Sequence, residues 1–219
     1  MIGERWSGGA PQQRELENGR KVRQFAAMYS WSPGYTQKEL EEAQERYELR
    51  FPPDLMALLL NQQPSPGYDW RGENNDIRRM LGWPLEMLLF GVEDGFWWPD
   101  WGERPDNPED RREVVESGLR AAPRLIPLIG HRFIPEEPRM EGNPVFSMHG
   151  FDTIYYGSNL AEYFRNEFEG KHEIGPVRHV PFWSDIVERP EDAYAFYVAT
   201  GKPEAALAAI QGGLRKKIS

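Results

Sequence analysis

From residue 40 onward, hydrophobic residues recur at helical spacing. They directly follow a sequence signal for the start of a helix. Thr36 and Glu39 stand three residues apart. In this arrangement the threonine hydroxyl and the glutamate carboxylate each accept a hydrogen bond from a backbone N–H that the first helical turn leaves free. The pattern predicts a helix that runs to about Arg46. The apolar positions on its expected buried face are Leu40, Ala43 and Tyr47.

A second apolar stripe predicts another helix a few residues later. Pro53 suits the first helical turn, where its missing N–H would be unpaired in any case, and Asp54 is favoured at the positive end of the helix dipole. The stretch 61–72 is rich in proline, glycine and polar residues, so we expect the helix to end near Gln62 and a polar loop to follow. The expected buried residues of this helix are Leu55, Leu58 and Leu59.

The pattern between residues 77 and 119 is less regular. Apolar residues from 77 to 89 predict helical structure, which we expect to break at Trp83 and Pro84 because proline disfavours helix at the residue before it. Residues 96–102 contain three tryptophans, a proline and a glycine, and predict no long regular element. Residues 109–119 predict a helix with two valines and a leucine as its apolar positions and acidic residues on the remaining face.

Short apolar runs predict strands in the second half of the chain. Pro127 places the first strand at a sheet edge or at a bulge, and Gly150 with Asp152 joins the other two as a hairpin. Asn159 can cap a helix over 160–168. Together these elements predict an α+β fold with a mostly antiparallel sheet and flanking helices. The predicted strands are 125–129, 144–148 and 153–156.

The two ends of the chain extend beyond these elements. Residues 1–30 begin with a glycine-, proline- and glutamine-rich stretch and continue at loosely helical spacing, which predicts a tail and a helix that is either docked or free. Residues 191–199 and 203–214 predict two further helices. Because no long glycine- and serine-rich linker interrupts the apolar pattern, we expect residues 31–219 to form a single domain.

Composition narrows the classes of function. The 219 residues are 39% hydrophobic and 13% aromatic, as is typical of a folded protein. The absence of cysteine excludes disulfides, cysteine nucleophiles and cysteine-bound metal clusters. No apolar run suits a signal peptide or a membrane span, so we expect a cytoplasmic protein without membrane contact. A net charge of −9 repels phosphate backbones, so we expect a basic protein partner rather than nucleic acid.

Acidic residues are concentrated around a cluster of tryptophans. From Glu93 to Glu116 there are nine acidic residues and three arginines, a local net charge of −6. Aromatic anchors ringed by carboxylates suit an interface with a basic partner, since aromatic rings supply contact area and acids steer the encounter. The alternative is that the tryptophans pack inside an irregular loop and the acids form a solvated face. The candidate partner-binding residues here are Glu93, Asp94, Trp97, Trp98, Asp100, Trp101 and Glu103.

His131 and Arg132 form a second candidate, because they follow a predicted strand where a loop can present polar groups from a rigid base. They could act as a general acid or bind an anion, or Arg132 could pair with a carboxylate and order the loop. The four histidines lack zinc-site spacing, so we expect no metal, and we expect no cofactor. The sequence has no serine-hydrolase elbow and no phosphate-binding glycine pattern.

The order of these pieces resembles the SUKH superfamily, which includes bacterial immunity proteins and fungal cell-wall-assembly regulators. The resemblance covers about residues 36 to 170. One departure is Gln62 after Asn61, where members often have an Asn-Gly pair. The segments that carry the resemblance are Glu39–Glu42, Leu49–Leu55, Leu58–Leu59, Arg124–Gly130, Gly142–Ser147, Ile154–Gly157 and Leu160–Phe168.

The resemblance implies one mostly antiparallel curved sheet flanked by helices, and a non-catalytic role in binding other proteins. Bacterial relatives typically neutralise toxins, often nucleases, and fungal relatives serve as interaction hubs. An immunity-type protein is therefore the leading expectation. The alternatives are a regulatory hub with several partners and, from a different class, an enzyme with a site near His131 and Arg132. The sequence leaves the identity of the partner and the oligomeric state open.

Overall fold

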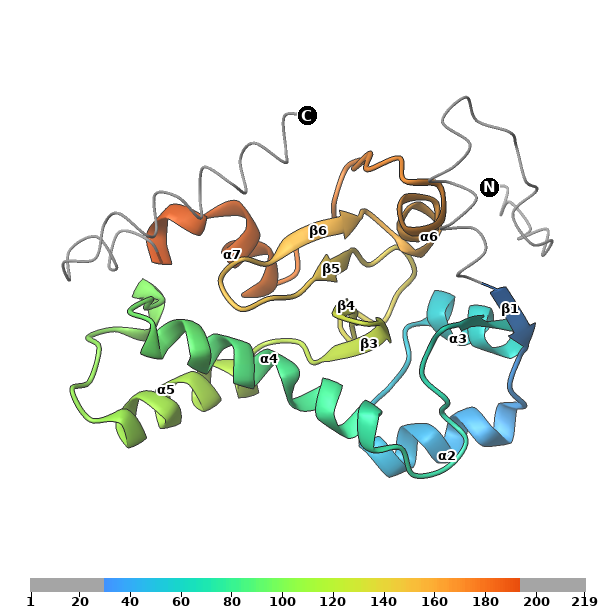
Figure 1. Ribbon diagram of the computed structural model, residues 1–219, viewed down its shortest axis with the longest axis horizontal. Helices are drawn as coiled ribbons and strands as arrows, with labels where there is room; N and C mark the ends of the chain where they lie inside the picture. Colours follow the sequence, from blue (N-terminus) through green and yellow to red (C-terminus); the bar gives the residue numbers. More distant parts are fainter. Residues whose placement is uncertain (1–29, 194–219) are drawn as a thin grey trace. The chain divides into compact units, whose positions relative to one another are not determined.

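The computed structural model describes residues 30–193 (Figure 1). The fold is α+β, as predicted. Its helices are α2 (Gln37–Tyr47), α3 (Pro53–Asn61), α4 (Asn75–Glu93), the 3-10 helix η1 (Pro99–Trp101), α5 (Pro108–Ala121), α6 (Leu160–Glu169) and α7 (Trp183–Glu188). Its strands are β1 (Ser30–Pro33), β2 (Gln62–Ser65), β3 (Leu125–Ile129), β4 (Arg132–Pro135), β5 (Val145–Ser147) and β6 (Ile154–Gly157).

Three predictions about the ends of the chain fall largely on residues that are not described. These are the tail and helix over 1–30, most of the helix over 191–199, and the helix over 203–214. Among residues 30–193, no helix combines the length and the apolar character that a membrane crossing requires.

The chain divides into two compact units, and each is built from three separate segments. Among the described residues, unit 1 contains 30–81, Leu125–Ser147 and Tyr155–Arg178. Unit 2 contains Gly82–Arg124, Met148–Ile154 and 179–193. The expected single domain over 31–219 stays a prediction.

The first predicted helix of unit 1 is confirmed, and it begins with the predicted capping box. The Glu39 N–H donates to Thr36 Oγ1 at 3.2 Å, and the Thr36 N–H donates to Glu39 Oε2 at 2.7 Å. These bonds favour the charged carboxylate and lower the pKa of Glu39. The helix ends at Tyr47, one residue beyond the expected end. The residues expected on the buried face, Leu40, Ala43 and Tyr47, are all buried.

The second predicted helix, α3, is also confirmed. Pro53 occupies its first turn, and the helix ends at Asn61, next to the expected Gln62. The Asp54 carboxylate accepts a hydrogen bond from the Gly142 N–H at 3.0 Å and so links the start of the helix to the β4–β5 connection. Burial raises the pKa of Asp54 and outweighs the opposing effect of this bond. The expected buried residues, Leu55, Leu58 and Leu59, are all buried.

Strands β1 and β2 form a small antiparallel sheet that the sequence pattern does not predict. Ser30 pairs with Ser65 and Pro33 pairs with Gln62, so β2 occupies part of the expected polar loop. Both strands have four residues and contain proline, which is confined to edge positions of sheets. Their pairing joins segments far apart in the sequence, and a local pattern does not reveal such a partner.

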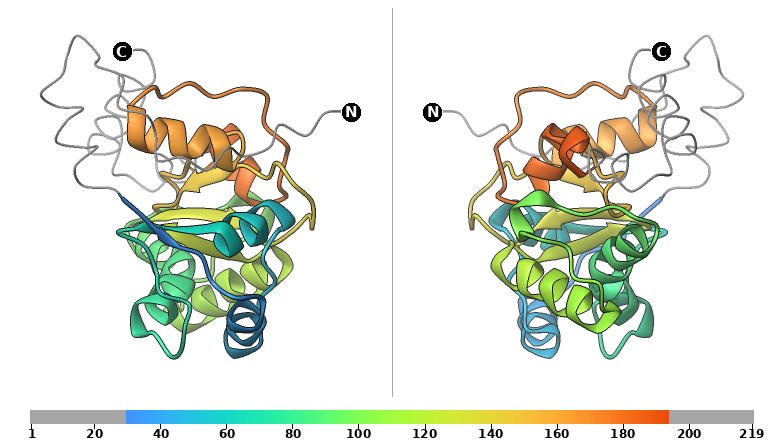
Figure 2. Two further views of the ribbon diagram at one scale, coloured as in Figure 1. Left: turned by 90° about the vertical axis from the view of Figure 1, so that its right-hand side faces the viewer. Right: turned by 90° about the vertical axis from the view of Figure 1, so that its left-hand side faces the viewer.

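A four-stranded sheet has the order β3-β4-β5-β6, and α6 lies beside it (Figure 2). Strand β3 is an edge strand and its register with β4 shifts between Pro127 and Ile129, so both expectations for Pro127 are confirmed. The predicted strands before and after Gly150 are confirmed as neighbours β5 and β6. Strand β4 corrects one prediction: the chain turns at Gly130 and His131, and Arg132 opens a strand instead of lying in a loop.

Helix α4 corrects the predicted break at Trp83 and Pro84. The helix is continuous from Asn75 to Glu93 with Pro84 inside it. Proline removes one helical hydrogen bond and crowds the preceding turn. Buried apolar residues on both sides of Pro84, including Ile77 and Leu88, stabilise the helix in spite of that cost.

The remaining helices of unit 2 are partly predicted. Helix α5 is confirmed over Pro108–Ala121, where the Asn107 side chain accepts a hydrogen bond from the Glu109 N–H at 2.9 Å. Residues 96–102 contain only the short η1, as expected. Helix α7 is not predicted, and its six residues are too few to show a helical period. The Asp185 side chain accepts a hydrogen bond from the Phe182 N–H at its start.

Helix α6 is confirmed with its predicted cap, and a buried carboxylate completes that cap. The Glu162 N–H donates to Asn159 Oδ1 at 2.9 Å. The Glu162 carboxylate accepts hydrogen bonds from the Ser158 N–H at 2.6 Å and from the Gly175 N–H at 3.1 Å. Burial raises the pKa of Glu162, but the bonds from Ser158 and Gly175 outweigh it, so the pKa lies below its usual value.

Glu162→Gln is expected to lower the free energy of unfolding at neutral pH by about 1 to 3 kcal/mol, because a glutamine amide replaces a charged acceptor of two backbone N–H groups. The folded-state pKa lies below the ordinary value of 4.5. The carboxylate therefore stabilises the fold above that pH, and this contribution is lost as the pH falls through the folded-state pKa. Urea unfolding across a pH series measures it. Glu173→Gln, at an exposed position in the following segment, is the control, and equal acid sensitivity of Glu162→Gln and the unmodified chain would contradict the assignment.

Candidate functional site

Trp97 and Trp98, two of the predicted partner-binding residues, are core residues of unit 2. Their side chains are 1% and 2% exposed. The Trp97 indole N–H donates to the Gly102 carbonyl at 2.8 Å, which satisfies its polar atom inside the unit. The alternative interpretation, packing inside an irregular loop, therefore applies to both tryptophans. Neither is available to a partner.

Trp101 is half-buried and belongs to a group of aromatic rings. Its ring centroid lies 5.2 Å from that of Trp97 and 6.1 Å from that of Phe151, and it stacks on Phe182 at 6.0 Å. Helix α5 approaches the same indole at Gly118, where an added Cβ would lie 2.4 Å from the Trp101 Nε1. Most of this ring is therefore fixed by packing, and only part of it can meet a partner.

Glu93 is held by an arginine from α5. The buried Arg111 donates to both carboxylate oxygens of Glu93, at 3.0 and 3.1 Å, and also to the carbonyls of Pro105 and Asp106. The hydrogen bonds from Arg111 lower the pKa of Glu93. This bidentate pair links the end of α4 to α5 and orders the intervening loop. Glu93 therefore supports the fold, but its side chain is 55% exposed, and its assignment to the partner-binding face stays a prediction.

Asp100 also has a partner inside unit 2. Arg189 lies 3.3 Å from Asp100 and 2.6 Å from Asp192, and its guanidinium sits over the Trp98 ring at 5.1 Å from the centroid. An arginine that stacks on an indole and pairs with two acids links η1 to the end of α7. Reversing the charge of Asp100 would disturb this contact, so Asp100 is unsuitable as a probe of partner binding.

Two acids of the predicted face, Asp94 and Glu103, are exposed and make no ion pair with any residue of the described range. They belong to a strongly charged unit. The described residues of unit 2 contain fifteen acidic and six basic side chains, a net charge of −9, whereas those of the longer unit 1 have a net charge of −5. Further exposed acids without an ion pair in the described part of unit 2 are Glu86, Asp106, Glu109, Asp110, Glu113, Asp152 and Glu191.

The second candidate, His131 and Arg132, lies in unit 1 at the β3–β4 turn. Arg132 is 3.3 Å from Glu167, donates to Ser147 Oγ at 2.7 Å and covers the Tyr156 ring at 3.8 Å from its centroid. His131 Nε2 lies beside the same guanidinium and the histidine is exposed. The pairing of Arg132 with a carboxylate is confirmed. Its guanidinium donates to protein groups that fix the turn on the sheet.

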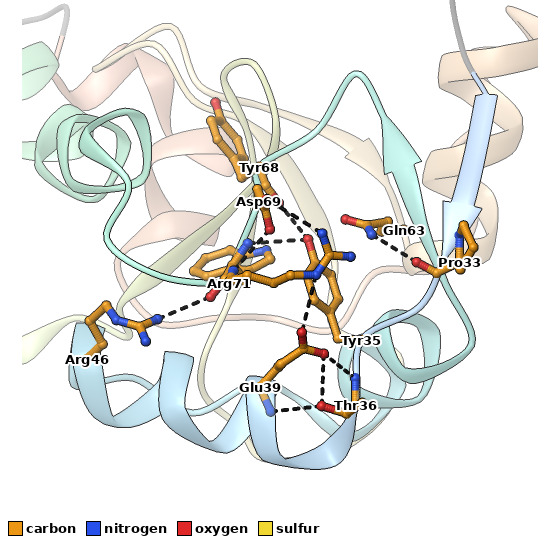
Figure 3. A network of polar contacts seen from close by, with 10 residues as sticks. Pro33, Tyr35, Thr36, Glu39, Arg46, Gln63, Tyr68, Asp69 and Arg71 are labelled. Atoms are coloured by element: carbon orange, nitrogen blue, oxygen red, sulfur yellow. Dashed lines mark hydrogen bonds and ion pairs between the residues drawn. The ribbon is translucent and has the colours of Figure 1, made fainter.

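A third polar cluster was not predicted (Figure 3). Arg71 covers the Tyr35 ring at 4.8 Å and lies 3.4 Å from Glu39 and 3.6 Å from Asp69. The Tyr35 hydroxyl donates to the Tyr68 carbonyl at 3.1 Å, and burial raises the pKa of Tyr35. These contacts hold the loop after β2 against the start of α2. The sequence offers no signal for them, because the partners lie far apart along the chain.

Comparison of the chain with protein families, curated proteins and solved structures finds no match. The elements on which the SUKH resemblance rests, α2, α3, β3, β5, β6 and α6, are all present in the expected order. The resemblance itself stays a prediction. Within residues 30–193, histidine, aspartate and glutamate side chains do not gather into a group of three that could hold a metal ion.

Proposed function

We propose that the protein is a non-catalytic, cytoplasmic binding module of immunity type, which neutralises a basic toxin protein through unit 2. The charge of unit 2 carries this proposal: fifteen acidic against six basic side chains in its described residues. The SUKH resemblance agrees with it, since bacterial relatives typically bind toxins. Glu93 and Asp100 are exposed but paired with arginines, whereas Asp94 and Glu103 are exposed and make no ion pair within residues 30–193.

The physical argument concerns association. A surface with one sign of charge raises the local concentration of an oppositely charged partner and speeds its encounter. A nuclease is a suitable partner, because an enzyme that binds a phosphate backbone needs a basic surface, and an acidic module can occupy that surface. The same charge repels nucleic acid from this chain. Binding by such a surface weakens as salt concentration rises.

The proposal is tested on a partner isolated with the full chain from its native cell. Glu103→Lys with Asp106→Lys should slow association by about tenfold at low salt and make it less dependent on salt, because exposed charges act mainly on the rate of encounter. The control is Glu45→Lys with Glu173→Lys, which changes the net charge equally on exposed residues of unit 1.

Surface-based kinetics over a salt series gives the rates, and circular dichroism verifies that both variants fold. Equal slowing by the two double variants would show that only net charge matters and would contradict a site on unit 2. Several weak partners in place of one tight partner would favour the regulatory hub, and turnover of a small molecule would favour an enzyme.

A further inference from the structure

Phe90 is the most exposed large hydrophobic residue among residues 30–193, with a relative accessibility of 66%. It lies near the end of α4, in unit 2. The other exposed large hydrophobics of residues 30–193 are aliphatic, lie in unit 1 and are between 38% and 48% accessible. A largely exposed aromatic side chain is a candidate for contact with a partner, because aromatic residues are enriched in protein interfaces.

The packing of α4 explains why Phe90 faces outward. Its neighbours Leu88 and Val92 are buried, and the helix approaches the ring of Phe151 at Gly91, where an added Cβ would lie 2.7 Å from Phe151 Cδ2. Unit 2 is thus packed mainly on the side of the helix that carries Leu88 and Val92, and most of Phe90 stays exposed.

Two further phenylalanines lie at this end of the helix. The half-buried rings of Phe96 and Phe151 stack with centroids 5.6 Å apart and an interplanar angle of 17°. The Phe96 N–H donates to the Gly91 carbonyl at 2.9 Å, which places Phe96 at the last turn of α4. All three phenylalanines border Gly91: Phe90 precedes it in α4, the Phe151 ring packs on it, and the Phe96 N–H donates to its carbonyl. We term Phe90, Phe96 and Phe151 the phenylalanine patch.

Acidic residues flank the phenylalanine patch. Glu86 stands four residues before Phe90 and shares its side of the helix, and Asp94 directly follows the helix, where its N–H donates to the Phe90 carbonyl at 3.0 Å. Asp152 directly follows Phe151. All three carboxylates are exposed and make no ion pair with another residue in the described range. An apolar centre with an acidic border is complementary to a basic surface that carries apolar side chains at its own centre.

We propose that the phenylalanine patch is the central contact of the binding surface, and that its occupant is a basic amphipathic segment of a partner protein. Apolar side chains of that segment cover Phe90, and its lysines or arginines meet Glu86, Asp94 and Asp152. The inference deepens the proposed function, on which it rests, and places the central contact residue, Phe90, outside the segment 93–106. The acidic border disfavours anionic membranes and a second copy of the acidic unit 2 as occupants.

The test uses a synthetic amphipathic helical peptide of leucine and lysine as the probe, with fluorescence anisotropy of the labelled peptide against the full chain. Phe90→Ser should weaken binding by at least about tenfold, because central aromatic anchors carry much of the binding energy. The matched control is Met140→Ser, an exposed apolar residue of unit 1 that should leave binding unchanged. Since Phe90 is exposed, its replacement should leave the thermal unfolding midpoint unchanged, and this is measured for both variants.

Several outcomes would overturn the inference. These are absence of peptide binding by the unmodified chain, equal binding by Phe90→Ser, and equal binding of a leucine–glutamate peptide. Pelleting with phosphatidylcholine–phosphatidylserine vesicles, or a dimer that Phe90→Ser dissociates, would assign the patch to another occupant. Salt-sensitive binding that Glu103→Lys with Asp106→Lys weakens but Phe90→Ser leaves intact would reject the inference and retain the proposed function.

Discussion

Replacing Trp97 with alanine is expected to lower the free energy of unfolding by about 3 to 5 kcal/mol, the range typical of a large aromatic side chain removed from a core. Trp97 is 1% exposed, contacts the Trp101 ring and donates its indole N–H to the Gly102 carbonyl. Alanine removes the buried ring and leaves a cavity, and the carbonyl loses its donor. Urea unfolding followed by far-ultraviolet circular dichroism measures the change.

Two further variants separate the causes. Trp97→Phe keeps most of the ring but loses the hydrogen bond, so its cost should lie between zero and that of alanine. Phe90→Ala removes an exposed aromatic side chain of the same unit and should change stability by less than about 0.5 kcal/mol. If Trp97→Ala and Phe90→Ala had similar small effects, Trp97 would be accessible and would return to the candidates for partner contact.

The parts of the fold that the sequence predicts correctly are those fixed by nearby residues. The capping box of Thr36 and Glu39 and the leucine stripe of α3 depend on residues within one or two helical turns. The position of Pro127 at a sheet edge and bulge follows from the missing N–H of proline alone. Each of these features needs no knowledge of a distant partner.

The features that the sequence does not predict depend on distant partners. Strand β2 exists because β1 pairs with it, although Pro64 and a turn-rich composition favour a loop. Pro84 stays inside α4 because both halves of that helix have buried residues. Arg132 lies in a strand because β4 pairs with β3 and with β5 on its other side. Local propensity yields to tertiary contacts in all of these cases.

The candidate partner-binding surface also has features that nearby residues reveal and features that depend on distant partners. The concentration of acids near residue 100 is visible in the sequence and remains the basis of the proposed function. The sequence does not show which of these acids lack an intramolecular ion pair. Arg111 pairs with Glu93 and Arg189 pairs with Asp100, and both arginines lie far from their partners along the chain. Phe90 directly follows the apolar positions of the predicted helical stretch 77–89, and only the packing of α4 shows that its ring is exposed.

Replacing Leu58 with alanine is expected to lower the free energy of unfolding by about 2 to 5 kcal/mol, through lost transfer free energy and the cavity left behind. Leu58 is 7% exposed and belongs to the core of unit 1 with residues of the sheet and of α6, including Ile126 and Phe164. A small recess lined in part by Leu58, Pro64 and Tyr68 borders this position. Neighbouring side chains can relax toward this recess, so we expect a value in the lower half of that range.

Leu60→Ala is the matched control, because the same substitution is made in the same helix at a side chain that is 38% exposed. Alanine has at least the helix propensity of leucine, so neither change weakens α3 as an isolated helix. The difference between the two variants in urea unfolding therefore reports burial alone. Costs below about 1 kcal/mol for Leu58→Ala, or equal costs for both variants, would mean that α3 presents another face to the core. Such a result would also remove the support that the leucine stripe gives to the SUKH resemblance, since this helix belongs to its opening segments.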